Sequence, residues 1–167
     1  MPHFREVSLN EFNTPAFSFG HKWAILSAGA EGSYNGMTVS WGQFGELWGH
    51  PVVTVYVRPQ RHTLKFMEES EYFTLSFFPE EQRAALRYFG AKSGRDGDKA
   101  SACGLIPIFD RGSVWYEQAE QVLLCRKLYR QELAANCFLD KSVDEQHYDG
   151  DYHVSFIGEV VACLRAE

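Results

Sequence analysis

The chain has 167 residues, of which 45% are apolar and 15% aromatic, and its formal net charge is −6. This length and composition fit one packed globular domain rather than a disordered chain. The acidic balance argues against a general nucleic-acid binder, which usually carries a basic face. Positive charge is local instead, at Arg58, Arg61, His62, Arg95 and Lys99, which suits a small anionic ligand better than a polyanion.

The four cysteines form no CxxC pair and stand among apolar neighbours, so we expect buried free thiols at Cys103, Cys125, Cys137 and Cys163. The N-terminus lacks the apolar stretch of a signal peptide. No apolar run approaches the ~18 residues that a membrane helix needs. We therefore expect a reducing, cytoplasmic setting and no membrane association.

In the first half of the chain, residues 1–20 form a lead-in without a clear pattern. Strands are predicted at 23–29 and 34–41, on either side of a turn at 31–33. Residues 42–49 are rich in glycine and aromatic side chains and are predicted to form a turn or loop. The nearly continuous apolar run at 52–57 predicts a central strand covered on both faces. A helix at 63–69 and a strand at 72–78 follow.

In the second half, Pro79-Glu80-Glu81 opens a helix that runs to about Phe89 and stops at Gly90. A charged loop at 92–99 and a short helix at 98–103 follow. Strands are predicted at 113–120, 121–133 and 152–161, although the composition of 117–133 also fits a helix, and 138–148 is predicted to be a loop or short helical turn. About six strands with few short helices favour an antiparallel barrel over a parallel α/β sheet.

Two segments carry the most information about function. Asn35 to Trp41 alternates hydroxyl and apolar side chains, as a strand does when its other face meets a ligand. Arg58 to Thr63 gathers two arginines, a histidine and a threonine where a strand gives way to a helix, which suits a phosphate. The alternative is an exposed cationic turn with Thr63 as a plain helix N-cap. Ser93-Gly94-Arg95 supplies a second group of this kind, and Trp41 is either a core aromatic or a wall for a planar ring.

Other chemistries find less support in the sequence. There is no GxSxG motif for a serine hydrolase, no Walker loop and no GxGxxG fingerprint. HxH and HExxH motifs are absent as well. His147, Asp149, Asp151 and His153 could ligate a metal, but a solvated acidic loop is the commoner explanation for such a segment.

Together these segments resemble the flavin reductase-like family of FMN-binding split-barrel proteins, over roughly residues 24–164. The resemblance is carried, in order, by 35–41, 51–63, 73–78, 93–99 and 151–159. It implies a mainly β fold, a six-stranded antiparallel split barrel with a few short helices, in a single domain over 1–167. It also implies a homodimer with FMN at the subunit interface.

The resemblance further implies residue roles. Asn35, Thr38, Val39, Ser40 and Trp41 would contact the flavin ring and ribityl chain, and Arg58, Arg61, His62 and Thr63 would hold the phosphate. Ser93, Gly94, Arg95 and Lys99 would lie near the cofactor, and His153 would face the flavin or the nicotinamide as a tentative catalytic residue. Because Tyr152 separates Asp151 from His153, which of Tyr152 and His153 points to the site stays open.

The implied activity is an NAD(P)H-dependent flavin reductase that passes electrons to an unknown acceptor, although a redox protein could be the electron donor in place of NAD(P)H. A flavin of this kind needs no catalytic nucleophile, because the protein supplies position and electrostatics, and Arg95 or His153 could donate hydrogen bonds near N1 and O2 of the ring. One alternative is a non-enzymatic, flavoredoxin-like electron carrier. Another is a flavin-free barrel that holds a different ligand such as haem.

Overall fold

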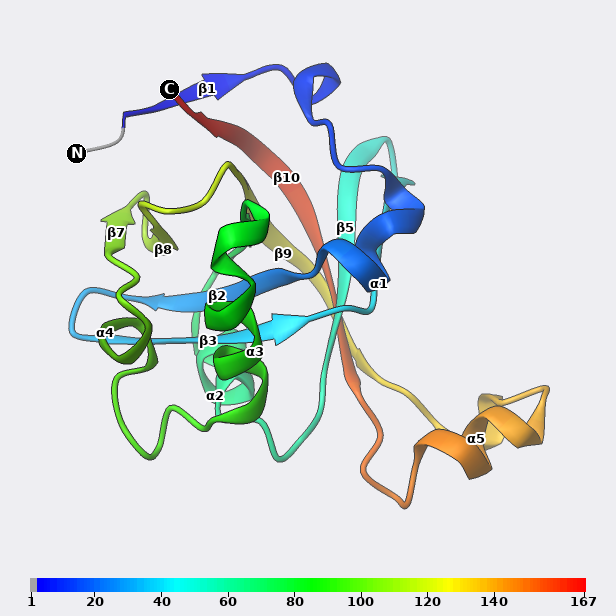
Figure 1. The fold of residues 1–167 in the computed structure, drawn as a ribbon. Coiled ribbons are helices and arrows are strands. Elements are labelled where there is room, and N and C mark those ends of the chain that lie inside the picture. The colour runs from blue at the N-terminus through cyan, green and yellow to red at the C-terminus, as the bar shows by residue number, and fades with distance from the viewer. Residues whose placement is uncertain (1–2) are drawn as a thin grey trace.

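The computed structural model describes residues 3–167, and a single large antiparallel sheet dominates it. The strands follow the order β3-β2-β6-β9-β10-β5-β4, and β1 pairs with β10 (Figure 1). Their bounds are β1 Phe4–Val7, β2 Ala24–Ala30, β3 Ser33–Val39, β4 Gly42–Leu47, β5 His50–Val57, β6 Tyr72–Phe77, β9 Gln121–Glu132 and β10 Val154–Ala166. A separate hairpin joins β7 Pro107–Asp110 to β8 Ser113–Tyr116. The predicted mainly β, antiparallel fold is confirmed, with eight strands in the main sheet rather than about six.

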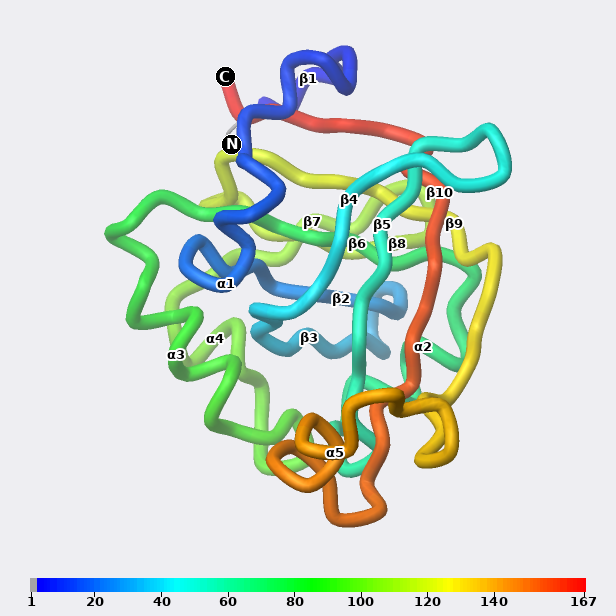
Figure 2. Tube along the Cα trace, turned by 90° about the vertical axis from the view of Figure 1, so that its right-hand side faces the viewer, coloured from blue at the N-terminus to red at the C-terminus, as the bar shows by residue number. Residues whose placement is uncertain are grey.

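The helices are short and lie around the sheet. They are α1 Phe19–Lys22, α2 Thr63–Glu69, α3 Arg83–Ala91, α4 Lys99–Cys103 and α5 Lys141–His147, with 3-10 turns at Leu9–Glu11, Ala16–Ser18, Glu80–Gln82 and Ala135–Cys137. Helices α2 and α3 contact β2 and β3. Helix α5 projects away from α3 and α4 (Figure 1), and β1 lies at the opposite end of the molecule from α5 (Figure 2). Within residues 3–167, no helix combines the length and the apolar character that crossing a membrane requires.

Two apolar clusters pack on the two faces of the sheet, and β2 contributes to both. Leu26 of β2 belongs to the cluster that contains Phe73 and Phe156. The neighbouring Ile25 belongs to the second cluster, with Phe89 of α3 and other residues that cover the outer face. Successive side chains of a strand point to opposite faces, so β2 and the start of β3 are held rigidly from both sides. This strand pair positions Asn35, Thr38 and Val39 of β3, which line two cavities.

The predicted loop at 42–49 is wrong, because it forms β4 and a tight hairpin with β5. The two-residue turn consists of Trp48 and Gly49, both with positive φ (56° and 72°), a turn geometry that matches hairpin twist. The prediction that the strand at 52–57 is covered on both faces is also wrong. Thr54 and Tyr56 are only half-buried, because β5 lies beside the end strand β4 rather than in the middle of the sheet.

Several other boundaries differ from the prediction. The strand predicted at 113–120 ends at Tyr116, where the chain turns and the Ala119 N–H bonds to the Tyr116 carbonyl (3.0 Å). The strand predicted at 121–133 is confirmed as β9. Segment 138–148 contains a true helix, capped by the Asp140 carboxylate. The last strand starts at Val154, so Tyr152 and His153 precede it.

All four cysteines are free, as predicted, but only two of them are buried. Cys125 and Cys163 lie in the core, whereas Cys103 is half-buried and Cys137 is exposed. Cys137 follows Asn136 in the 3-10 turn after β9, a segment that leaves the sheet. Apolar neighbours in the sequence therefore predicted burial correctly for Cys125 and Cys163, which lie in strands of the sheet, but not for the other two cysteines.

Candidate functional site

A first cavity runs along the end of β3. Its volume is ≈ 200 Å³, and its walls come from β3, from the residues just after it, from β5 and from the start of β10; they are Met37, Thr38, Val39, Ser40, Trp41, Tyr56, Arg58 and His153. The structure thus brings together six of the residues predicted from sequence. Trp41 is 47% exposed, so it is a wall of this cavity and not a core aromatic.

A second cavity lies at the other end of β3 and is strongly basic. Its volume is ≈ 210 Å³, and it is lined by Asn35, Gln60, Arg61, His62, Ala91, Lys92, Ser93, Gly94, Arg95 and Lys99. Five of these side chains are basic and, among the described residues that line it, none is acidic. Burial, and then the charges of Arg95 and Lys65 among others, lower the pKa of His62, as expected where positive charge accumulates. The second cavity therefore suits an anionic group.

One buried hydrogen bond joins the strand to the cationic turn. The Asn35 side-chain amide donates to the Thr63 hydroxyl (Nδ2 to Oγ1, 2.8 Å), and both residues are buried. Gly94 packs against the same amide so closely that a Cβ there would lie 2.1 Å from Asn35 Oδ1. Three sequence-predicted segments thus meet at Asn35. The alternative role of Thr63 as an N-cap is wrong, because the cap position is His62, which makes no side-chain capping bond.

Two cations, the half-buried Arg61 and the buried Lys99, form the back of the second cavity. The Arg61 guanidinium donates to the Gly90 carbonyl (2.7 Å) and the Phe89 carbonyl (3.2 Å). The Lys99 ammonium donates to the carbonyls of Gly36, Phe89 and Lys92. These carbonyls include the unpaired acceptors at the end of α3, which carry partial negative charge. Burial, and then the neighbouring Arg61, lower the pKa of Lys99 to about 8.

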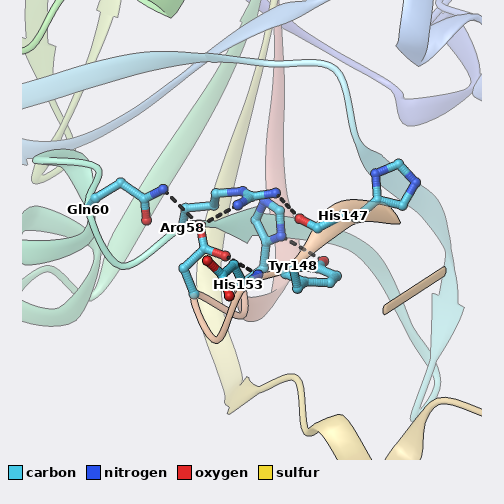
Figure 3. A network of polar contacts seen from close by, with 7 residues as sticks. Arg58, Gln60, His147, Tyr148 and His153 are labelled. Atoms are coloured by element: carbon cyan, nitrogen blue, oxygen red, sulfur yellow. Dashed lines mark hydrogen bonds and ion pairs between the residues drawn. The ribbon is translucent and has the colours of Figure 1, made fainter. Parts of the chain in front are cut away.

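Arg58 lies apart from the other three residues of the predicted phosphate group. A turn closed by the Arg61 N–H and the Arg58 carbonyl (3.0 Å) separates Arg58 from the second cavity. The Arg58 guanidinium pairs with Asp151, donates to the His147 carbonyl (2.6 Å) and lies 5.2 Å from the centre of the Tyr148 ring (Figure 3). Arg58 therefore anchors the segment around α5 beside the first cavity.

His153, and not Tyr152, lines the first cavity. The His153 side chain is almost fully buried, its Nδ1 lies 2.8 Å from the Tyr148 hydroxyl, and its ring centre lies 5.4 Å from that of Trp41. Burial, and then the Arg58 charge, lower the pKa of His153 to about 4, so its imidazole is neutral at pH 7. Tyr152 stacks on Tyr148 (5.0 Å) and turns its hydroxyl to Asp144 (2.8 Å).

The metal site considered for this segment does not form. Hydrogen bonds from the Asp149 N–H and then from Gln60 and Arg58 lower the pKa of Asp151 to about 2, so its carboxylate is already engaged. Within residues 3–167, no group of three or more histidine, cysteine or carboxylate side chains is arranged to hold a metal.

Sequence reasoning missed a third cavity beside the first. It has a volume of ≈ 370 Å³ and lies between the sheet and the segment around α5, lined by Trp41, Gly42, Gln43, Tyr56, Leu133, Phe138, Val143, His147 and Tyr148. Trp41 and Tyr56 border both cavities. Tyr56 could have been found, since it alternates with buried valines in its strand. The lining residues from 133–148 could not have been found from the sequence, because only the fold brings this segment back over the sheet.

Comparisons with known proteins agree with this architecture. Residues 16–167 match the model of the flavin reductase like domain, and the chain belongs to that family. No curated protein sequence matches the chain. Among solved structures, it is similar to an FMN-binding domain of flavin reductases-like enzyme from Shewanella baltica, at 20% identity and a TM-score of 0.68 over 98% of this chain and 78% of the other.

Two further structures share the fold. Flavoredoxin of Desulfovibrio vulgaris is 17% identical, with a TM-score of 0.68 over 98% of this chain and 77% of its own. An NADH:FAD oxidoreductase from Streptomyces globisporus is 18% identical, with a TM-score of 0.65 over 87% of this chain and 77% of the other. The fold is thus shared by a flavoredoxin and by an NADH:FAD oxidoreductase.

The buried, neutral state of His153 predicts a pH dependence of stability. A histidine whose pKa is lower in the folded than in the unfolded state favours unfolding as pH falls through the unfolded value, near 6.5, toward the folded value of about 4. Between pH 7 and pH 5 this one group should cost the native state at most about 2 kcal/mol. Urea unfolding at both pH values measures the loss, and His153→Gln should reduce it. The control His21→Gln removes an exposed histidine; an equal effect of both substitutions would contradict the assignment.

Proposed function

We propose that this chain binds FMN across the first two cavities. The observation that carries the proposal is the second cavity, where five basic side chains and no carboxylate surround an opening beside Asn35 and Thr63. A phosphate supplies the negative charge that this cavity lacks. Strand β3 leads from there to the first cavity, whose strand backbone, Trp41 and Tyr56 offer a wall for a flat ring. Membership in the flavin reductase-like family supports the same cofactor.

Different residues would hold the phosphate and the ring of such a cofactor. The exposed Arg95 and the half-buried His62 would meet the phosphate directly, whereas Arg61 and Lys99, which already donate to backbone carbonyls, would act through their fixed charge. Ser40 and Trp41 would lie along the ring. When bound, a flavin accepts a hydride or single electrons and passes them on. The neutral His153 would offer a hydrogen bond at the ring without adding a charge.

The activity that we propose is NAD(P)H-dependent flavin reduction. The third cavity shares Trp41 and Tyr56 with the first and has room for a second planar ring, which favours an enzyme with a small-molecule reductant. The NADH:FAD oxidoreductase of the same fold supports this reading. The alternative, an electron carrier, is supported by the flavoredoxin.

Arg95→Ala should weaken FMN binding about tenfold, because it removes one charge-assisted hydrogen bond to the phosphate. Riboflavin, which lacks the phosphate, should bind Arg95→Ala and the wild type equally well. Quenching of flavin fluorescence measures both dissociation constants. The control is Arg87→Ala, which removes an exposed arginine of α3 that does not line the second cavity. An unchanged FMN affinity of Arg95→Ala would place the phosphate elsewhere.

Anaerobic titration separates the two activities. If the chain is a reductase, NADH or NADPH should bleach the absorbance of the FMN-loaded protein within seconds under argon. An electron carrier should keep its oxidised spectrum with both nucleotides and be bleached only by dithionite. A purified protein that shows no flavin spectrum, even after incubation with FMN, would favour the reading in which the barrel holds another ligand.

We also propose a homodimer. Leu47, Trp48 and Tyr129 leave large apolar surfaces exposed near the β4–β5 hairpin, and the Trp48 and Tyr129 rings lie side by side (6.1 Å). Sedimentation velocity at micromolar concentration should report twice the mass of the chain, 38 rather than 19.1 kDa. Trp48→Ser should shift the equilibrium toward the monomer. A wild-type protein that sediments as a monomer, with and without FMN, would rule the dimer out.

A further inference from the structure

The hydrogen bond between Tyr148 and His153 has a preferred direction. The Tyr148 hydroxyl and His153 Nδ1 lie 2.8 Å apart (Figure 3). An unprotonated imidazole nitrogen is a much better acceptor than a phenol oxygen, and a phenol is a good donor. The favoured arrangement therefore has Tyr148 donating to Nδ1. Because a neutral imidazole carries one proton, that proton must then be on Nε2.

Tyr148 is itself held in place from several sides. The Arg58 guanidinium lies over its ring at 5.2 Å, and Tyr152 stacks on it at 5.0 Å with the planes 27° apart. Phe138 packs nearby, with ring centres 5.7 Å apart. The Tyr152 hydroxyl is tied in turn to Asp144 of α5 (2.8 Å). The ring contacts with Arg58, Tyr152 and Phe138, all of which a Tyr152→Phe substitution keeps, fix the phenol and, through it, the orientation of the imidazole.

Nε2 of His153 is the nitrogen left for a ligand. Within residues 3–167, it neither donates to nor accepts from another group, and His153 lines the first cavity. The groups that face the ring are Trp41, Tyr56, Tyr148 and the Arg58–Asp151 ion pair. Among them, only Tyr148 makes a hydrogen bond to the imidazole.

We propose that Tyr148 is a positioning residue, which fixes His153 as the Nε2–H tautomer and aims this donor at an acceptor atom of the ligand in the first cavity. The identity of the ligand as a flavin rests on the proposed function. The assignment of the tautomer rests only on the hydrogen bond between Tyr148 and His153. The donor suits a ring carbonyl oxygen or an unprotonated ring nitrogen. Since burial also keeps the pKa of His153 at about 4, the donor persists unchanged across neutral pH.

The first test needs no cofactor. Long-range ¹H–¹⁵N NMR of the ligand-free protein at pH 7, with the His153 signals assigned by comparison with His153→Gln, reads the protonation of each ring nitrogen. We expect a protonated Nε2 and an unprotonated Nδ1 in the wild type. Tyr148→Phe should give intermediate shifts as both tautomers become populated. A proton on Nδ1 in the wild type, or an unchanged spectrum in Tyr148→Phe, would overturn the proposal.

The second test measures binding with a matched pair of variants. Tyr148→Phe and Tyr152→Phe each remove one hydroxyl from the same aromatic cluster, but only the Tyr148 hydroxyl contacts His153. FMN affinity should fall about tenfold in Tyr148→Phe and stay within twofold in Tyr152→Phe. Equal effects, or none in Tyr148→Phe, would refute a positioning role. A wild type that binds no FMN would defeat the proposed function, while the NMR result would still decide the tautomer.

Discussion

The site is organised by two cations, the buried Lys99 and the half-buried Arg61, that have carbonyl oxygens, rather than carboxylates, as partners. Arg61 and Lys99 share the Phe89 carbonyl and also reach Gly90, Lys92 and the Gly36 carbonyl of β3. A buried charge is costly unless it is paired and hydrogen-bonded. Here the hydrogen bonds are made but no carboxylate neutralises the charge, so burial, and then the neighbouring Arg61 charge, lower the pKa of Lys99. The remaining positive potential opens onto the second cavity, so an anion bound there would also stabilise the fold.

The same contacts hold the cationic turn, the end of α3 and β3 in one arrangement. The Asn35–Thr63 hydrogen bond and the close approach of Gly94 complete this junction. Further along β3, a second network gathers around His153 and is tied to α5 through Tyr148 and Arg58. Strand β3 therefore connects a cavity lined by basic side chains with a cavity lined by aromatic ones. This order matches a molecule that has a phosphate at one end and a flat ring at the other.

Much of this arrangement could be predicted from sequence because it lies in regular patterns. The alternation in 35–41 and the cluster at 58–63 pointed to β3 and its neighbouring turn, and these segments do line the cavities. Their placement was harder to predict. Arg58 and Arg61 are three residues apart but face different cavities, because the turn between them reverses the chain. From the sequence alone, Arg58 and Arg61 were predicted to belong to one phosphate-binding cluster.

Other features depend on long-range contacts that no local pattern contains. Strand β4 escaped prediction because its hairpin turn is Trp48-Gly49 rather than a common turn sequence, and pairing with β5 overrides the low strand propensity of its glycines. The orientation of Tyr152 and His153 was open because strand parity does not apply to residues that precede the strand. In the structure His153 points into the first cavity, where its ring bonds to Tyr148, five residues earlier in the chain.

A crystal structure of the protein grown with FMN tests the central claim most directly. We predict that the phosphate lies in the second cavity, within hydrogen-bonding distance of His62 or Arg95, and that the ring lies in the first cavity, alongside Trp41 and residues 38–40. FMN bound with its phosphate outside the second cavity, or with its ring away from β3, would contradict the proposed binding site.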